Sequence, residues 1–204
     1  MAKLKNITKK FPLNGTFKRN KRKAKKKEHD PNTGLRKLFI DEIQDIYRAE
    51  KSLTKAFPKM IKNATAVLLV EALIGHLEAT QKHVTKLEGA FPFTGEKSES
   101  KKCKAMSYLI KDARSIIKGT EDAMARDAAI ISVVQKIEHY EIATYGTLCS
   151  FANALGETEA SLLLHEILIE EKAVNERLSE LAELGINAEA VADNLSVSEQ
   201  KQLA

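Results

Sequence analysis

The stretch QKIEHYEIATYG, residues 135–146, decides how this chain folds. Apolar side chains in and around it recur every three or four residues, which predicts one long helix with a stripe that faces a core. Glu141 occupies a step of that stripe, and Glu138 lies one turn away on the same flank. A buried carboxylate without a partner is costly, so proteins pair it, protonate it or use it to bind a metal ion. The stretch therefore predicts a helical core that contains acidic groups.

The composition is that of a helical protein with a strongly basic start. Hydrophobic residues make up 43% of the 204 positions, 5% are aromatic and Trp is absent, which is typical of a helical bundle. Residues 1–30 hold 12 Lys or Arg against two acidic residues, a local charge of +10, so the formal +5 of the chain leaves −5 for residues 31–204. We interpret residues 1–33 as a basic, disordered tail, residues 34–185 as the folded bundle and residues 186–204 as a weakly patterned C-terminal tail.

Two helices are predicted in the first half of the bundle. The first begins near residue 35, carries Glu50 within its apolar stripe and is expected to kink at Pro58. The second spans about residues 66–87 and is expected to end at Gly89 and the following Pro92. Its expected inward positions are Leu73, Leu77, Val84 and Leu87.

The second half predicts a short helix over about residues 103–119 and long helices over about 121–155 and 159–184. Gly156 and Gly185 are expected to end the two long helices, and Thr158 is expected to cap the last one. Short connections make each pair of long helices antiparallel neighbours, and a long crossover joins the pairs. This predicts an all-α, ferritin-like four-helix bundle of two hairpins with an extra short helix, since an up-down-up-down bundle uses short loops throughout.

Acidic residues lie near the middle of all four long helices. Glu50, Glu78, Glu138 and Glu171 each fall within about two residues of a helix midpoint, so they are expected to meet at one level of the bundle. Carboxylate oxygens suit iron or manganese, and paired-metal bundles combine single Glu ligands with Glu-x-x-His motifs. The predicted metal ligands, for two iron or manganese ions, are Glu50, Glu78, Gln81, Glu138, Glu141 and Glu171.

Less specific interpretations stand beside the metal site. A Glu in a charged helix is commonly solvated, and the four bundle histidines, scattered over different helices without HExxH spacing, are interpreted as surface or half-buried structural residues. These are His76, His83, His139 and His165. Tyr145, one turn from Glu141, is expected in the core, where its hydroxyl can donate a hydrogen bond to that carboxylate.

Other classes of protein are disfavoured. The two cysteines have no CxxC spacing, the sequence lacks nucleotide-binding glycine motifs, and neither a signal peptide nor an 18-residue apolar run occurs. We therefore expect a cytoplasmic protein without a membrane partner.

The sequence resembles the YciF-type ferritin-like proteins, bacterial stress-associated bundles with a dinuclear metal site. The resemblance covers roughly residues 35–183 and rests on six blocks: DIYRAEKSLTKAFPKM, HLEATQKHVTKLEGAF, CKAM, RDAAII, QKIEHYEIATYGTL and IEEKAVNERL. It implies that Glu50, Glu78, Glu138, Glu141 and Glu171 stand at metal-site positions. Gln81 stands where members can carry His, and Ser107 stands where a Glu is often found.

The resemblance implies stress association and leaves turnover of any reaction open. A di-iron centre can reduce dioxygen or peroxide, so iron or peroxide oxidation is the expected chemistry. We expect a homo-oligomer, most simply a dimer. The alternative is a metal-poor bundle that associates with nucleic acid through its tail, since Lys-rich segments bind phosphates non-specifically and similar tails occur on Dps-type ferritin-like proteins. The tail residues expected to contact nucleic acid are Lys18, Arg19, Lys21, Arg22, Lys23, Lys25, Lys26 and Lys27.

Overall fold

A computed structural model describes residues 34–94 and 103–192, and this part of the chain contains helices and no strand. The elements are α1 (Gly34–Asn63), α2 (Val67–Thr94), α3 (Lys104–Gly119), α4 (Ala123–Leu155), α5 (Thr158–Leu181) and the π-helical turn η1 (Ala182–Ile186). The predicted basic tail lies outside the described residues.

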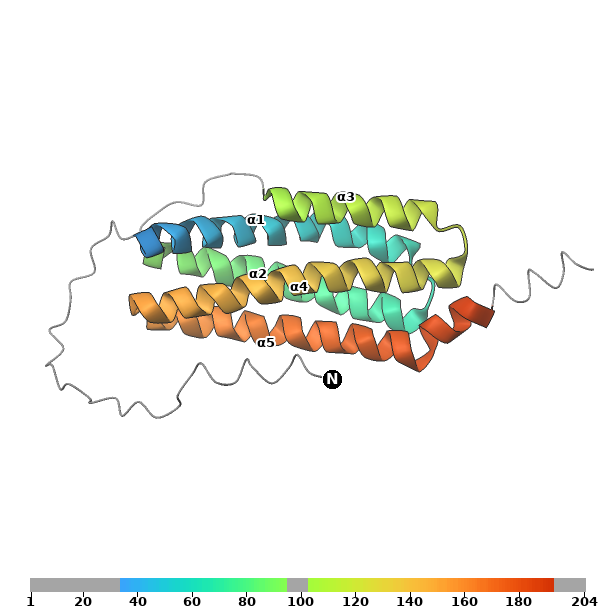
Figure 1. Ribbon diagram of the computed structural model, residues 1–204. Helices are drawn as coiled ribbons and strands as arrows, with labels where there is room; N and C mark the ends of the chain where they lie inside the picture. The colour runs from blue at the N-terminus through green and yellow to red at the C-terminus, as the bar shows by residue number, and fades with distance from the viewer. Residues whose placement is uncertain (1–33, 95–102, 193–204) are drawn as a thin grey trace, which may run out of the picture. The chain divides into compact units, whose positions relative to one another are not determined.

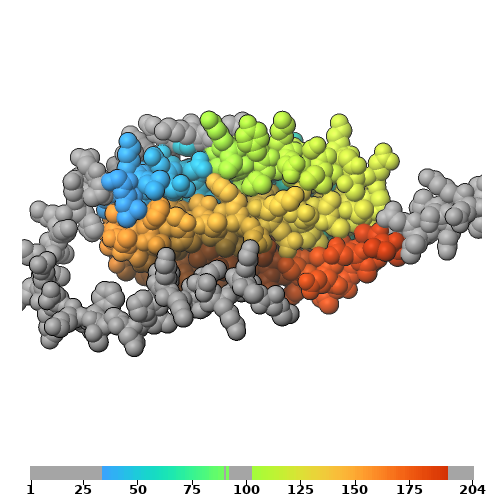
Figure 2. All heavy atoms as spheres, in the orientation of Figure 1, coloured from blue at the N-terminus to red at the C-terminus, as the bar shows by residue number. Residues whose placement is uncertain are grey.

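The four long helices form two hairpins, as the connection lengths predicted (Figure 1). Residues 64–66 join α1 to α2, and residues 156–157 join α4 to α5. α1 packs against α2 and α4, and α5 packs against α2 and α4, which closes the bundle. The crossover helix α3 packs against α1 and α4, and Figure 2 shows it along one side of α4 with α5 along the other. The ferritin-like four-helix architecture with an extra short helix is confirmed.

Apolar stripes from each helix fill the core. Helix α1 continues past the exposed Pro58, and its buried stripe continues with it, because Met60 is buried on the same face as Phe57. The buried members of this stripe are Phe39, Ile43, Ile46, Leu53, Phe57 and Met60. Their spacing places Glu50, also fully buried, at mid-depth of the bundle.

Three helix boundaries differ from the sequence-based prediction. α2 continues past Gly89 and Pro92 to Thr94. Gly185 lies inside η1 rather than ending the last helix, and residues 187–192 are helical as well. Glycine weakens a helix without forbidding it, so packing by neighbouring residues such as the buried Ile186 overrides the local preference. Thr158 is the first residue of α5 and not its cap, because Glu157 holds the N-cap position without a side-chain hydrogen bond.

The Gly156 cap and the hydrogen bonds of Asp127 position the two hairpins. Gly156 adopts the left-handed conformation (φ 76°) that ends α4, as predicted. Asp127 of α4 is fully buried and accepts hydrogen bonds from Thr65 N (2.9 Å), Thr65 Oγ1 (2.7 Å) and Ala66 N (2.6 Å). It thereby satisfies backbone donors at the start of α2 and ties the first hairpin to the second.

Across the described ranges, none of the helices combines the length and the apolar character needed to span a lipid bilayer.

Candidate metal centre

Six ionisable side chains from four helices meet in the interior of the bundle. They form two groups that share one residue, and within each group one potential ligand atom per residue lies within 4.8 Å of all the others. The first group is His76, Glu138, Glu141 and Glu171, and the second is Glu50, His83 and Glu171. All six are buried, with at most 3% of any residue exposed.

Helix α2 places its two histidines by the period of its buried face. Leu69, Leu73, His76, Thr80, His83 and Leu87 follow one another at three- and four-residue steps, and all are buried. Thr80 donates its hydroxyl hydrogen bond to the carbonyl of His76, 2.9 Å away, so its polar group is satisfied on its own helix. The histidines are thus the residues that α2 directs toward the acidic groups of the other helices.

The first group consists of polar atoms that lack hydrogen-bond partners. His76 Nε2 lies 2.9 Å from Glu138 Oε1, yet neither atom has the geometry of a hydrogen bond. Both oxygens of Glu138, Glu141 and Glu171 are also buried without a partner. Unsatisfied buried carboxylates are expensive, and a cation bound between them would satisfy all of these atoms at once.

The second group is oriented by residues around it. His83 Nδ1 lies 2.9 Å from Glu171 Oε1 and 3.5 Å from Glu50 Oε1. On the other side of the ring, His83 Nε2 lies 2.6 Å from Glu170 Oε2, and Lys86 Nζ contacts the second Glu170 oxygen at 2.8 Å. A proton on Nε2 leaves the Nδ1 lone pair directed at the acidic groups, the arrangement in which a carboxylate orients a metal-binding histidine.

Tyr145 completes the surroundings of Glu50. Its hydroxyl donates to Glu50 Oε1 at 2.5 Å, and the tyrosine is fully buried. The expectation of a core tyrosine is confirmed, but the acceptor differs from the predicted Glu141 because Tyr145 reaches across to α1 rather than along its own helix. The second Glu50 oxygen remains buried without a partner.

Without a metal, burial and mutual repulsion make the cluster hold protons. Burial raises the pKa of Glu138 to about 8 even though His76 opposes the shift. Burial, reinforced by repulsion from Glu50, raises the pKa of Glu141 well above its usual range, and burial also raises that of Glu50. In the metal-free protein the acidic groups are therefore neutralised by bound protons and not by a cation.

The contacts between the histidines and Glu171 shift the pKa values of both partners toward their charged forms. Burial alone would lower the pKa of His83, but its contacts with Glu171 and Glu50 outweigh burial and raise it to about 10. Burial alone would raise the pKa of Glu171, but His83 and His76 hold it below its usual value. Imidazolium and carboxylate groups therefore stabilise each other in the metal-free protein.

The charge and donor set of the cluster fit two divalent ions. Its four carboxylates carry a charge of −4 when ionised and its two imidazoles are neutral as ligands, so two doubly charged cations neutralise it. Mixed carboxylate and imidazole donors suit iron and manganese. Glu171 belongs to both groups, so it is the residue that they share.

The structure brings together four of the six predicted ligands: Glu50, Glu138, Glu141 and Glu171. The expectation that Glu78 and Gln81 would join them is wrong, because both side chains are exposed on the outer face of α2. His76 and His83, interpreted from sequence as structural, take their place. The placement of His139 and His165 on the surface agrees with the sequence-based interpretation.

The sequence contained a signal for the missed histidines. Leu77 and Val84, chosen as inward positions, are only half-buried, and the fully buried stripe lies one residue earlier at His76 and His83. A chain of steps from Leu69 through Leu73 to Leu87 passes through both histidines at regular spacing. Choosing this stripe as the buried face of the helix would have predicted His76 and His83 as inward residues in place of Glu78 and Gln81.

Comparison with known proteins agrees with this architecture. A family model described as a domain of unknown function (DUF892) matches residues 34–191. Protein YciF of Escherichia coli strain K12 is 40% identical over 154 residues, covering 75% of this chain and 93% of the relative.

Solved structures extend the likeness to the fold. The crystal structure of the E. coli stress protein YciF matches with a TM-score of 0.72 over 75% of this chain and 97% of that chain, at 40% identity. YcfI of Rhodopseudomonas palustris matches at 0.70 with 41% identity, covering 74% and 96% of the two chains. Ferritin-like, diiron-carboxylate proteins of Bacillus anthracis strain Ames match at 0.58 with 16% identity over 73% and 98%, a likeness of fold alone.

Proposed function

The chain belongs to the YciF family, the domain of unknown function DUF892, and on that premise we propose that its buried cluster binds two ions of iron or manganese. The observation that carries the proposal is the set of unsatisfied atoms at the centre of the bundle. Both oxygens of Glu138, Glu141 and Glu171 make no hydrogen bond to a described group, and the same holds for both nitrogens of His76 and for Nδ1 of His83. A protein core built only for stability would pair or remove these groups.

The surrounding residues have separate roles in this proposal. Glu170 holds a proton on His83 Nε2 and so keeps Nδ1 available, while Tyr145 fixes the rotamer of Glu50. Full burial of Glu138 and Glu141 excludes bulk water from the site. When bound, a pair of iron ions would supply the two electrons needed to reduce dioxygen or peroxide. The relative's description as a stress protein supports a role in a stress response.

Metal stoichiometry tests the proposal directly. The protein is loaded with Fe(II) or Mn(II) under anaerobic conditions, passed through a desalting column and analysed for metal by mass spectrometry. We expect about two ions per chain for the wild type. We expect a clear loss for His76→Ala and for Glu171→Gln, which removes the shared carboxylate.

Glu78→Ala is the matched control, because Glu78 lies on the same helix as His76 with its side chain exposed. It should retain the wild-type metal content. Less than one ion per chain in the wild type, or equal metal loss in Glu78→Ala and His76→Ala, would contradict the proposal.

We also propose that the basic N-terminal segment binds nucleic acid without sequence specificity. Its support is the local charge of +10 in residues 1–30, which lie outside the described part of the chain. Deleting residues 1–30 should abolish retardation of a DNA fragment at low salt, and the wild-type affinity should fall steeply as salt is added. Retardation that survives the deletion would discard this second proposal.

Whether the folded bundle pairs with a second copy can be checked on the same samples by light scattering.

A further inference from the structure

An apolar pocket lies beside the metal-site cluster. It has a volume of about 250 Å³ and is bordered by α2, α4 and α5. Its walls are made by Leu73, Val134, Val174 and Leu178. Val134 comes from α4, one turn before Glu138, so the pocket and the cluster occupy adjacent levels of the bundle.

Of the six cluster residues, His76 alone also lines this pocket. The residue is 3% exposed, and neither of its ring nitrogens has a hydrogen-bond partner. Its ring packs edge-to-face against Phe57 at 4.6 Å between centroids, which holds the imidazole in place. A molecule in the pocket would therefore contact a residue that belongs to the cluster.

The open side of the pocket is bordered by small residues. Gly75 and Ala173 both line the pocket and are both exposed, so they allow access between α2 and α5. Arg177 is the one charged residue in the lining, and its guanidinium lies 3.1 Å from Glu180 on the surface of α5. Its charge is thus engaged at the rim rather than inside.

These walls select the class of ligand. The pocket is open on one side, and its largely apolar lining favours uncharged apolar molecules such as xenon over polar ones. Hydrogen peroxide would lose hydrogen bonds to water and find no replacement along Leu73, Val134 and Val174. Dioxygen forms no comparable hydrogen bonds to water, so it loses none when it enters the pocket.

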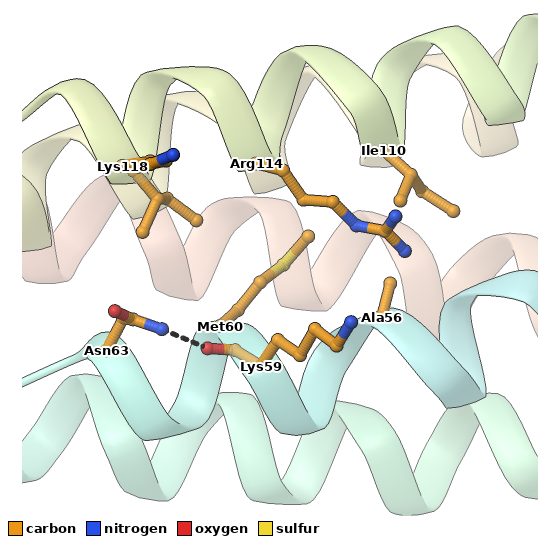
Figure 3. A pocket seen from close by; sticks show the side chains of 8 residues that line it. Ala56, Lys59, Met60, Asn63, Ile110, Arg114 and Lys118 are labelled. Atoms are coloured by element: carbon orange, nitrogen blue, oxygen red, sulfur yellow. Dashed lines mark hydrogen bonds between the residues drawn. The ribbon is translucent and has the colours of Figure 1, made fainter.

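A second groove of about 190 Å³, between α1 and α3, shows the contrast. Its floor includes Met60 and Ile110, but Figure 3 shows the charged ends of Lys59 and Arg114 reaching over it from its two walls. None of the residues that line it belongs to the metal-site cluster. Of these two pockets in the described part of the chain, the one beside His76 has the position and the chemistry that suit a gas molecule that must reach the cluster.

We propose that the α2–α5 pocket binds dioxygen and is its route to the His76 side of the cluster. The proposal rests on the proposed metal function for its purpose. Its physical content, an apolar gas site that ends at His76, is a property of this chain's own residues and is measurable without metal.

Gly75 provides a way to close the pocket. A Cβ atom added at Gly75 meets nothing within 4 Å, so a side chain can begin there without a clash at its first carbon. Gly75→Leu should fill the opening and, because Leu is the better helix former, should not lower the stability of α2. Gly146→Leu is the matched control, since Gly146 is also a helical glycine next to a buried residue of the site, with nothing within 4 Å of an added Cβ, and lies outside the pocket.

The first measurement uses metal-free protein and xenon gas as the probe. Methyl resonances of Leu73, Val134, Val174 and Leu178 should shift with xenon pressure in the wild type and in Gly146→Leu. In Gly75→Leu these shifts should be strongly reduced. Absent shifts in the wild type, or unchanged shifts in Gly75→Leu, would overturn the pocket assignment.

The second measurement uses Fe(II)-loaded protein and compares oxidants. Gly75→Leu should slow iron oxidation by dioxygen several-fold and leave oxidation by hydrogen peroxide unchanged. Equal slowing with both oxidants, or no slowing with dioxygen, would overturn the route. A wild type that takes up xenon but no metal would refute the proposed function while supporting the gas site, so the two failures are distinguishable.

Discussion

His83 Nε2 and Glu170 Oε2 lie 2.6 Å apart, and this contact sets which nitrogen of the imidazole faces the centre of the bundle. Glu170 and Glu171 are neighbours on α5, yet they contact opposite edges of the same ring. One is partly exposed and held by Lys86, and the other is fully buried. Glu170 therefore orients the His83 ring through Nε2, and Glu171 contacts the other ring nitrogen, Nδ1.

Removing the orienting carboxylate should weaken metal binding without destroying the site. For Glu170→Ala we expect an apparent metal affinity roughly 10- to 100-fold lower, because the His83 tautomer is no longer fixed. Competition with a chelator of known affinity measures the change. Glu166→Ala is the control, since Glu166 lies 3.6 Å from Lys86, while the acidic partners of His83 in the described part of the chain are Glu50, Glu170 and Glu171. Equal loss in both variants would show that charge at this surface, rather than the His83 contact, is responsible.

The stability of the metal-free protein should fall as pH rises. Glu138 has a pKa of about 8 in the fold against 4.5 as its ordinary value, so its contribution is complete below pH 4.5 and is lost as pH rises through 8. His83, raised from 6.5 to about 10, contributes fully below pH 6.5 and loses that contribution as pH rises through 10. Glu171 has a lowered pKa and acts in the opposite direction only at acid pH.

Urea unfolding in the presence of a chelator, repeated between pH 5 and 10, measures this dependence. Glu138→Gln should flatten the slope between pH 5 and 8. Metal affinity should change in the opposite sense and increase with pH, because bound metal replaces the protons of the cluster. A metal-free protein whose stability rises over this range would contradict the protonated state of the acidic groups.

The Tyr145 hydroxyl should matter most before metal binds. Tyr145→Phe leaves a buried oxygen of Glu50 without its donor, and we expect a loss of about 1–3 kcal/mol in the unfolding free energy of the metal-free protein. Added metal should recover part of the loss by satisfying the Glu50 oxygens. Tyr108→Phe, at a tyrosine that is 69% exposed, should leave the stability unchanged. Chemical denaturation with and without metal compares the two variants.

The Asp127 contact should be a principal support of the hairpin arrangement. Asp127→Ala removes the acceptor for Thr65 and Ala66 at the start of α2, and we expect a loss of about 3 kcal/mol. Asp112→Ala is the comparison, because Asp112 forms only an exposed pair with Lys136 at 3.9 Å and its removal should cost less than about 1 kcal/mol. Comparable losses would mean that the buried contact adds nothing beyond surface charge.

The sequence predicted the α1, α4 and α5 contributions to the site because their acidic residues stand out against the residues around them. Glu50 and Glu141 each replace a hydrophobic residue within a stripe, and a stripe fixes the rotation of its helix. The choice of Glu171 over the adjacent Glu170 followed from its depth along the helix and from the family resemblance. The four-helix topology followed from the short connections, which permit only antiparallel neighbours.

Helix α2 could not be oriented in the same way. Leu77 and Val84 offer a second apolar face next to the true one, so the sequence allowed two rotations that differ by one residue. Histidine fits a half-buried surface as well as a core, and it gave no preference between them. Only packing against α1 and α5 selects the rotation that buries His76 and His83 and exposes Glu78.

The crossover helix α3 makes the two flanks of the bundle different, a covered front on the α1–α4 side and an uncovered back on the α2–α5 side. Two similar hairpins placed side by side would present equivalent flanks, but α3 packs on the α1–α4 flank and not on the opposite one. The back, where α2 meets α5, keeps its small residues and its pocket. In the proposed route, a segment that supplies no ligand therefore covers one flank of the bundle and leaves the α2–α5 flank open for approach to the buried cluster.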